Sequence, residues 1–305
     1  MKVSGFSFVR DAIRLDYPIV QAITSILPIC NEFWVSVGRS EDGTADAIRA
    51  IGDQKIKIIE TDWDPKYFVH GAINAQQTDV ALSRCTGDWC FYLQADEVVH
   101  ERDLPVIKET MEKHLGHPRV EGLLFDYLHF WGSYETYQRA HGWYRHEVRV
   151  IRNGLGISSW KSAQGFRRDG QKLQVVPCAA TIWHYGWVRH PRLMKRKQVA
   201  LDSLHHDARW VDQRHPDREA LFQYGSLKHL ARFSGTHPRV MHDRIAKKDW
   251  TVEDDPAVTH RHNKLGNRVL SFVENSILRR GIGEYKNYVL IKDRDSRFEI
   301  RESTT

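Results

Sequence analysis

The stretch WCFYLQADE (residues 89–97) carries an apolar run directly into two neighbouring carboxylates, Asp96 and Glu97. Mg²⁺ and Mn²⁺ prefer oxygen ligands, and Mg²⁺ is commonly shared between one or two protein carboxylates and substrate phosphates. A carboxylate at the tip of a buried strand supplies such a ligand from rigid backbone. The pattern predicts a divalent cation on Asp96, helped by Glu97. A strand that merely ends in polar residues is the alternative, and spacing alone leaves it open.

Segments of strand and helix character alternate before this stretch. Strand patterns cover residues 3–9, 32–38 and 55–60, and helical patterns cover residues 17–27 and 73–84. This alternation predicts βαβ units and a mostly parallel sheet, which is an α/β fold. Ligands of such sheets bind beyond the carboxyl ends of the strands, where the carboxylates of the opening stretch also lie.

The remainder of the chain has a different pattern. Aromatic-rich strands are expected at residues 120–131, 144–151 and 173–183. From Val188 onward the pattern turns helical, with segments near residues 192–210, 218–233 and 265–280. We therefore expect an α/β region over residues 1–187 and a helical C-terminal region over residues 188–305.

Composition excludes several classes of protein. Of the 305 residues 41% are hydrophobic and 28% charged, which is enough apolar material for a packed core and excludes disorder over most of the chain. Lys and Arg outnumber Asp and Glu by only 45 to 39, so no nucleic-acid partner is expected. The four cysteines form no CxxC pair, and no apolar run reaches the length of a membrane span. The expected location is the cytoplasm.

Three motifs follow one another in the first part of the chain: SEDGT (40–44), GDW (87–89) and YLQADE (92–97). Together they resemble the family 2 glycosyltransferases of the GT-A fold, over about residues 3–190. The resemblance implies a GT-A-like sheet flanked by helices, a nucleotide-sugar donor and transfer with inversion at the anomeric carbon. It also implies that QAD (94–96) is a variant of the DxD motif, in which Asp96 holds Mn²⁺ or Mg²⁺ on the donor diphosphate.

The same resemblance assigns further residues to the donor. Ser40 and Asp42 would shape the donor loop, and Gln94 would contact the donor, although it brings no charge. The segment VSVGR (35–39) also lacks the aspartate that often reads the base. The second departure leaves the nucleobase open. Gln94 and the acid-free segment 161–165 keep open a second interpretation, a catalytically inactive nucleotide-sugar binding module of the same fold. A sugar nucleotidyltransferase is a third, but it is expected to have a glycine-rich loop with a lysine where this chain has FVRDA (8–12).

A second metal ligand is expected late in the chain. His184 stands in IWHYGW (182–187), at the end of the last strand-like run. Many GT-A enzymes supply a late histidine as a further metal or diphosphate ligand, and the resemblance implies this role for His184. A histidine simply packed among aromatic rings is the alternative.

Inversion requires a carboxylate that takes the proton of the acceptor hydroxyl. The matching stretch of this chain, SWKSAQGF (159–166), contains no acid. Glu147 is the first candidate, followed by Glu135, Asp126 and Asp169. Strand alternation predicts that Val148 and Val150 share the face opposite to Glu147 and Arg149.

Two later segments suggest partners. Arg189, Arg192, Lys195, Arg196 and Lys197 crowd nine positions without an acid, as on a solvated helix face or in a clamp for phosphate. The amphipathic segment 265–280 more often covers its own domain than a lipid surface. The resemblance implies a sugar or lipid-linked acceptor, with peripheral contact at the inner face of a membrane left open.

Overall fold

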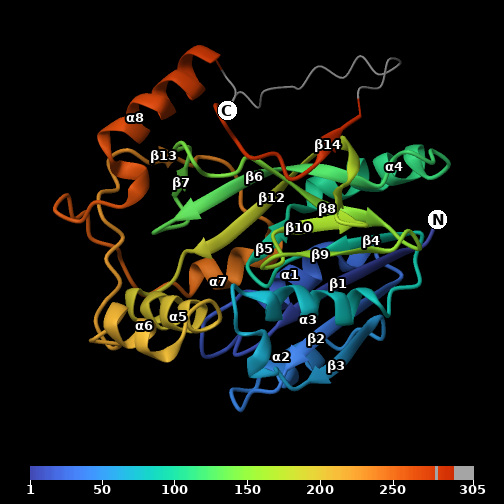
Figure 1. The fold of residues 1–305 in the computed structure, drawn as a ribbon, viewed down its shortest axis with the longest axis horizontal. Coiled ribbons are helices and arrows are strands. Elements are labelled where there is room, and N and C mark those ends of the chain that lie inside the picture. The colour runs from blue at the N-terminus through green and yellow to red at the C-terminus, as the bar shows by residue number, and fades with distance from the viewer. Residues whose placement is uncertain (279–280, 292–305) are drawn as a thin grey trace.

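The computed structural model describes residues 1–278 and 281–291 (Figure 1). Its main sheet begins with four parallel strands in the order β3-β2-β1-β4, which are Ile56–Thr61, Glu32–Gly38, Val3–Val9 and Trp89–Tyr92. The antiparallel strand β8 (His146–Arg152) follows, and then the parallel pair β6 (Gly122–Trp131) and β12 (Gln174–Trp187). The prediction of an α/β, GT-A-like, mostly parallel sheet flanked by helices is confirmed.

Short strands extend this sheet around β12 and β6. Strand β5 (Glu97–Val99) pairs antiparallel with β12, and β14 (Val289–Leu290) pairs parallel with it. On the other side of β6 lie β7 (Thr136–Gln138) and β13 (Ala231–Arg232). A separate three-stranded sheet consists of β9 (Ile157–Trp160), β10 (Gly165–Arg168) and β11 (Gln171–Lys172).

Helices cover both faces of the main sheet. Helix α1 (Ile19–Ile26) and helix α4 (Leu104–His114) pack their apolar residues against one face, together with Phe33, Phe91 and Phe125. Helix α3 (Ala72–Leu82) lies on the other face, where the small sheet also contributes Phe166 to the core. Helix α2 (Thr44–Arg49) follows β2. Short 3₁₀ turns occupy Leu27–Ile29, Pro65–Tyr67, Glu101–Asp103, Arg239–Met241 and Arg261–Asn263.

The region after Val188 is less helical than expected. It contains α5 (Pro191–Ser203), α6 (Ala208–Arg214), α7 (His242–Ala246) and α8 (Leu265–Phe272), which a π-helical turn extends over Val273–Leu278. The expected helix over residues 218–233 is wrong, because Phe222 and Tyr224 are buried against Trp131 from an irregular segment. Gly225 in this segment has a φ of 72°, which is incompatible with a continuous helix. Residues 279–280 and 292–305, part of the expected helical region, lie outside the described residues.

The alternation expected for β8 is wrong at one point. Leu123 pairs with Val150 while Leu124 pairs with Val148, so that Arg149 is an extra residue and the strand is bulged there. Val148 and Val150 consequently pack into different clusters on opposite faces of the sheet. Glu147 and Arg149 both line the cavity described below.

None of the helices among the described residues combines the length and the apolarity needed to cross a bilayer.

Candidate active site

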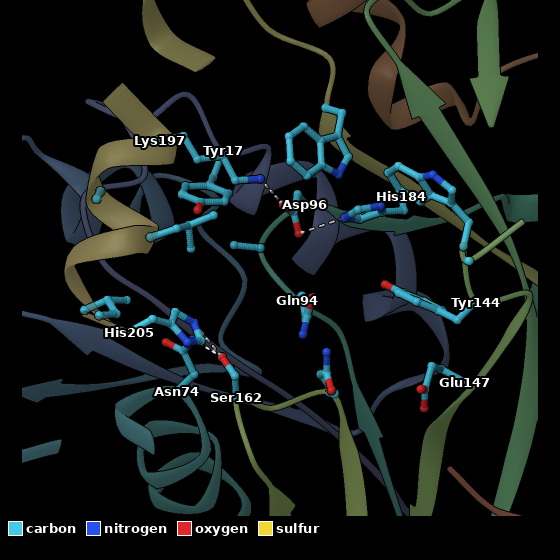
Figure 2. Close-up of a pocket in the computed structure, with 18 of the residues that line it drawn as sticks. Tyr17, Asn74, Gln94, Asp96, Tyr144, Glu147, Ser162, His184, Lys197 and His205 are labelled. Atoms are coloured by element: carbon cyan, nitrogen blue, oxygen red, sulfur yellow. Dashed lines mark hydrogen bonds and ion pairs between the residues drawn. The ribbon is translucent and has the colours of Figure 1, made fainter. Parts of the chain in front are cut away.

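A cavity of about 890 Å³ opens at the edge where the parallel strands end. Its wall includes residues that follow β1 and β4 and residues at the end of β12. Since β8 runs antiparallel to its neighbours, its first residues lie at this same edge. Helix α5 and the segments 141–145 and 281–285 line further parts of its wall. The topology therefore brings segments from residue 8 to residue 285 to one site (Figure 2).

Asp96 lies at the cation-rich end of this cavity. It is only 6% exposed, and Lys197 of α5 donates from Nζ to its Oδ2 at 2.9 Å. Burial alone would raise the pKa of Asp96, but the Lys197 ammonium, with the buried Arg189 nearby, holds this pKa well below its usual range. Burial and Arg189 lower the pKa of Lys197 to about 8. Asp96 is therefore a carboxylate at neutral pH.

His184 lies beside Asp96, although 88 positions separate the two in the sequence (184 − 96). Its Nε2 is 3.8 Å from Oδ1 of Asp96. The ring folds back over Gly186, where a Cβ would overlap the imidazole and lie 2.9 Å from Oδ2 of Asp96, so that only glycine leaves room. Burial lowers the pKa of His184 to about 4. The imidazole is consequently neutral at neutral pH.

The donor atoms of Asp96 and His184 fit a divalent cation. Carboxylate oxygen and neutral imidazole nitrogen are ligands that Mn²⁺ accepts, and Oδ1 of Asp96 and Nε2 of His184 lie 3.8 Å apart. In the described part of the chain, no group of three or more acidic, His or Cys side chains is arranged for a metal. A metal here would therefore take its remaining ligands from the donor and from water.

Glu97 is not placed to share that ligand role. Arg149 donates from Nε and Nη2 to the two carboxylate oxygens of Glu97, each at 2.8 Å, and both side chains are fully buried. Tyr127 also donates its hydroxyl to Glu97 at 2.8 Å. Adjacent carboxylates at the end of β4 thus point to different partners, with Asp96 at the cavity and Glu97 in a buried ion pair.

Glu147 lies at the other end of the cavity, and Figure 2 shows Gln94 between it and Asp96. The Glu147 carboxyl is 7% exposed, and burial raises its pKa to about 7. Asn287 donates from Nδ2 to Oε2 of Glu147 at 3.5 Å, a long contact that compensates little of the burial. Arg149, two residues further along β8, is held by Glu97.

The remaining predicted acids do not reach the cavity. Asp126, Glu135 and Asp169 are all exposed and do not line it. Among the four carboxylates considered as the base, the structure therefore brings only Glu147 to the site.

The predicted donor residues divide into two groups. Gln94 lines the cavity and donates from Nε2 to the carbonyl of Ala163. Ser40 and Asp42 do not line it. Asp42 instead accepts hydrogen bonds from the Thr44 backbone N–H and from the backbone N–H of Arg14, in the loop after β1. The SEDGT turn thereby holds the loop that follows β1.

Sequence reasoning missed several side chains of the site. Lys197 was noticed only as one of five crowded cations, and of these Lys197 and Arg189 turn out to be buried while Arg192 and Arg196 are exposed. Its position on the inner face of α5, three residues after the buried Met194, is the signal that could have singled it out. Trp63 is a further missed residue. It lies 6.2 Å from Phe8 between ring centroids, with the Arg10 guanidinium 5.5 Å from its ring.

Comparisons with known proteins give structural likeness alone. No family model matches the chain, and no curated protein matches it. A solved structure of S. aureus TarS 1–349 in complex with UDP-GlcNAc is 13% identical, covers 72% of each chain and has a TM-score of 0.38. Glucosyl-3-phosphoglycerate synthase from Mycobacterium tuberculosis, in complex with Mn²⁺, UDP-glucose and glycerol 3-phosphate, is 17% identical, covers 41% of this chain and 44% of its own, and has a TM-score of 0.31. Both are glycosyltransferases, but similarity this low carries no argument about the ligands of the present chain.

Proposed function

We propose that the chain is a metal-dependent, inverting glycosyltransferase that moves a sugar from a nucleotide-sugar donor to a hydroxyl acceptor. One observation carries the proposal: a single cavity holds an ionised carboxylate among cations at one end and a carboxyl with a pKa of about 7 at the other. Two carboxyl groups whose environments drive their pKa values apart are typical of a site that both stabilises charge and transfers a proton.

The Asp96 end suits a diphosphate leaving group. Asp96 and His184 would hold the divalent ion, which supplies positive charge against the charge that develops on the diphosphate. Lys197 and Arg189 add fixed cations at the same end, in a buried environment where they are effective. Gln94 would contact the donor from the floor of the cavity, and Ser40 and Asp42 would act indirectly, through the loop after β1.

The Glu147 end suits a general base. In a single displacement, the acceptor oxygen forms a bond to the anomeric carbon while the bond from that carbon to the diphosphate oxygen breaks. The hydroxyl proton passes to the Glu147 carboxylate, and the configuration at carbon inverts. A base is most effective when its pKa lies near the working pH, as burial arranges for Glu147.

A nucleobase would fit the aromatic side of the cavity. Phe8 and Trp63 both line it, and the Arg10 guanidinium lies against the Trp63 ring. Nε of Arg10 also lies 3.6 Å from Oδ2 of Asp11, which holds the guanidinium beside the Trp63 ring. Aromatic faces with an adjacent arginine are suited to stacking on a base.

The proposal is tested by thermal unfolding with UDP, GDP, dTDP or CMP, each with and without Mn²⁺. A nucleotide at a hundred times its dissociation constant stabilises the folded chain by about 2.7 kcal/mol. We expect one nucleotide to stabilise the protein only with the metal, and the matching nucleotide sugar to be consumed. Asp46→Asn, at an exposed acid of α2, is the control for Asp96→Asn.

Each alternative predicts a different outcome. Stabilisation without any turnover, including slow hydrolysis, would identify an inactive binding module. Release of pyrophosphate from a nucleoside triphosphate and a sugar phosphate would identify a nucleotidyltransferase. No stabilisation by any nucleotide would contradict the proposal itself.

We further propose that α8 touches an anionic membrane surface, where a lipid-linked acceptor would be within reach. Helix α8 exposes its apolar face and packs a polar residue against the chain. Leu265 and Phe272 are 73% and 63% exposed, whereas Ser271 accepts a hydrogen bond from the backbone N–H of His141. Lys264 and Arg268 are also exposed. Apolar side chains flanked by cations fit an anionic lipid surface, whereas a symmetric second copy would oppose like charges.

Vesicle sedimentation tests this contact. We expect the chain to bind vesicles that contain phosphatidylglycerol and not vesicles of phosphatidylcholine alone, and a Leu265→Ser/Phe272→Ser variant to lose the binding. A concentration-dependent dimer that the same variant abolishes, without vesicle binding, would show that the face is covered by a second copy.

A further inference from the structure

A buried histidine connects His184 to the backbone. Nδ1 of His129 lies 2.9 Å from Nδ1 of His184, and Nε2 of His129 lies 2.8 Å from the carbonyl oxygen of Tyr144. We infer that His129 is a positioning residue that fixes the tautomer of His184. In this tautomer Nδ1 of His184 carries the proton, and Nε2 of His184 presents a free lone pair to the cavity. The importance of this tautomer for metal binding rests on the proposed function, but the tautomer itself does not.

The first step of the argument concerns the backbone carbonyl. A carbonyl oxygen only accepts hydrogen bonds, so the 2.8 Å contact requires a proton on Nε2 of His129. A neutral imidazole carries one proton. Nδ1 of a neutral His129 is therefore an acceptor.

The second step concerns the contact between the two rings. One of the two Nδ1 atoms must donate to the other, and a neutral His129 leaves this task to His184. The reverse arrangement needs a proton on both nitrogens of His129, which would charge it. His129 is 2% exposed and is packed against the rings of Tyr127, Trp143 and Tyr144, an environment that disfavours a charge.

The consequence appears at Asp96. With the proton on Nδ1, Nε2 of His184 and Oδ1 of Asp96 are two acceptors that face each other at 3.8 Å. A cation or a hydrogen-bond donor of the ligand can bridge them. In the other tautomer Nε2–H could donate directly to Asp96, and the site would be closed by its own side chains. His129 thus keeps the pair open.

The sheet imposes this arrangement. His129 of β6 and His184 of β12 are direct partners in the parallel register, and Tyr144 precedes β8, the other neighbour of β6. The strand pairing therefore positions the relay, by which we mean the hydrogen-bonded chain from His184 through His129 to the Tyr144 carbonyl. Metal-bound histidines commonly donate their second ring nitrogen to a carboxylate, a backbone carbonyl or water, which orients the ligand, and His129 would take the place of such a partner here.

The tautomer is measured directly by two-bond ¹H–¹⁵N correlation spectra of the metal-free protein labelled at histidine nitrogen. We expect His184, assigned with a His184→Asn variant, to show a protonated Nδ1 and an unprotonated Nε2. A proton on Nε2 of His184 in the wild-type spectrum would overturn the inference whatever the enzyme does.

Variants at residue 129 test the positioning role. Glutamine can accept from His184 and donate to Tyr144, whereas phenylalanine can do neither. We expect His129→Phe to lose the single tautomer of His184 and to bind Mn²⁺ about 10- to 100-fold more weakly in the presence of nucleotide, and His129→Gln to retain both. Manganese affinity is read by electron paramagnetic resonance.

The matched control is His237, which donates to the carbonyl of Tyr134 but contacts the Tyr185 hydroxyl rather than His184. His237→Gln should leave the tautomer and the affinity unchanged. An unchanged His184 tautomer in His129→Phe would refute the role. If the wild type shows the expected tautomer but binds no metal, the relay stands and the proposed function fails.

Discussion

The two ends of the cavity treat a buried carboxyl group in opposite ways. Asp96 and Glu147 are almost equally buried, at 6% and 7% exposure, but the pKa of Asp96 is held well below its usual range and that of Glu147 is raised to about 7. Asp96 has the Lys197 ammonium on one oxygen. At Glu147 burial outweighs the opposing effects of Arg149, whose guanidinium Glu97 holds, and of the long hydrogen bond from Asn287. Burial raises the free energy of the charged form at both positions, and only the ammonium beside Asp96 offsets it.

Asp96→Asn should have the largest effect. It leaves the buried Lys197 without its partner, and breaking a buried ion pair costs about 3–5 kcal/mol of folding free energy. Chemical denaturation measures this loss, and we expect Mn²⁺-dependent nucleotide binding to disappear with it. The double variant Asp96→Asn/Lys197→Met should recover stability but not nucleotide binding, which separates the two roles.

Arg196→Met is the control, since its exposed side chain is next to Lys197 on the same helix. A stable Asp96→Asn variant with unchanged metal-dependent affinity would refute the contrast at the Asp96 end.

Glu147→Gln should lower transfer by about 10²- to 10⁴-fold, the usual contribution of a general base, while donor affinity stays unchanged. The amide keeps the size of the side chain but cannot take a proton. Single-turnover transfer and nucleotide titration measure the two quantities. Asp126→Asn, on the neighbouring strand but exposed, should transfer normally. Wild-type transfer by Glu147→Gln would make Glu147 a structural residue.

The pH dependence should show the same carboxyl group. The base must be ionised, so kcat/KM should rise about tenfold per pH unit below pH 7 and level off above it, where the pKa of Glu147 lies. Glu147→Gln should lack this rise. An identical slope in both enzymes would assign the titration to another group.

Stability should change in the opposite direction over the same range. The pKa of Glu147 is about 7 in the folded chain, against about 4.5 for a glutamate in the unfolded chain, so the folded state binds more protons between these values. The free energy of unfolding should therefore decrease as pH rises from about 4.5 to 7. Glu147→Gln should be less sensitive to pH in this window, as urea unfolding at several pH values would show.

Asn287→Ala should have the smallest effect. Asn287 lowers the pKa of Glu147 only slightly, through its 3.5 Å hydrogen bond. Its removal should move the rise of kcat/KM to somewhat higher pH and leave its plateau nearly unchanged. A shift to lower pH would show that the Asn287 side chain acts on Glu147 by excluding water and not through its hydrogen bond.

Much of the fold was predictable because its cause is local. The alternation of strands and helices predicts a parallel sheet, and the apolar run before Asp96 predicts a strand whose end meets a ligand. The resemblance that led to His184 also placed it with Asp96, and the structure brings these two side chains together. The prediction of a helix at residues 218–233 was wrong because the apolar residues there pack against Trp131, which is distant in the sequence. Local periodicity contains no information about such a contact.

By itself, the sequence determined three features: the sheet, the strand end that carries Asp96, and the late strand that ends near His184. Only the tertiary structure decided which charges meet. In the sequence Lys197 cannot be distinguished from its exposed neighbours, but in the structure it donates to Asp96 from the inner face of α5. Glu97 has the sequence position of a metal ligand, but Arg149 donates to both of its oxygens. The bulge at Arg149 likewise depends on its pairing with β6. Secondary structure follows from neighbours along the chain, whereas the state of a buried charge follows from neighbours in space.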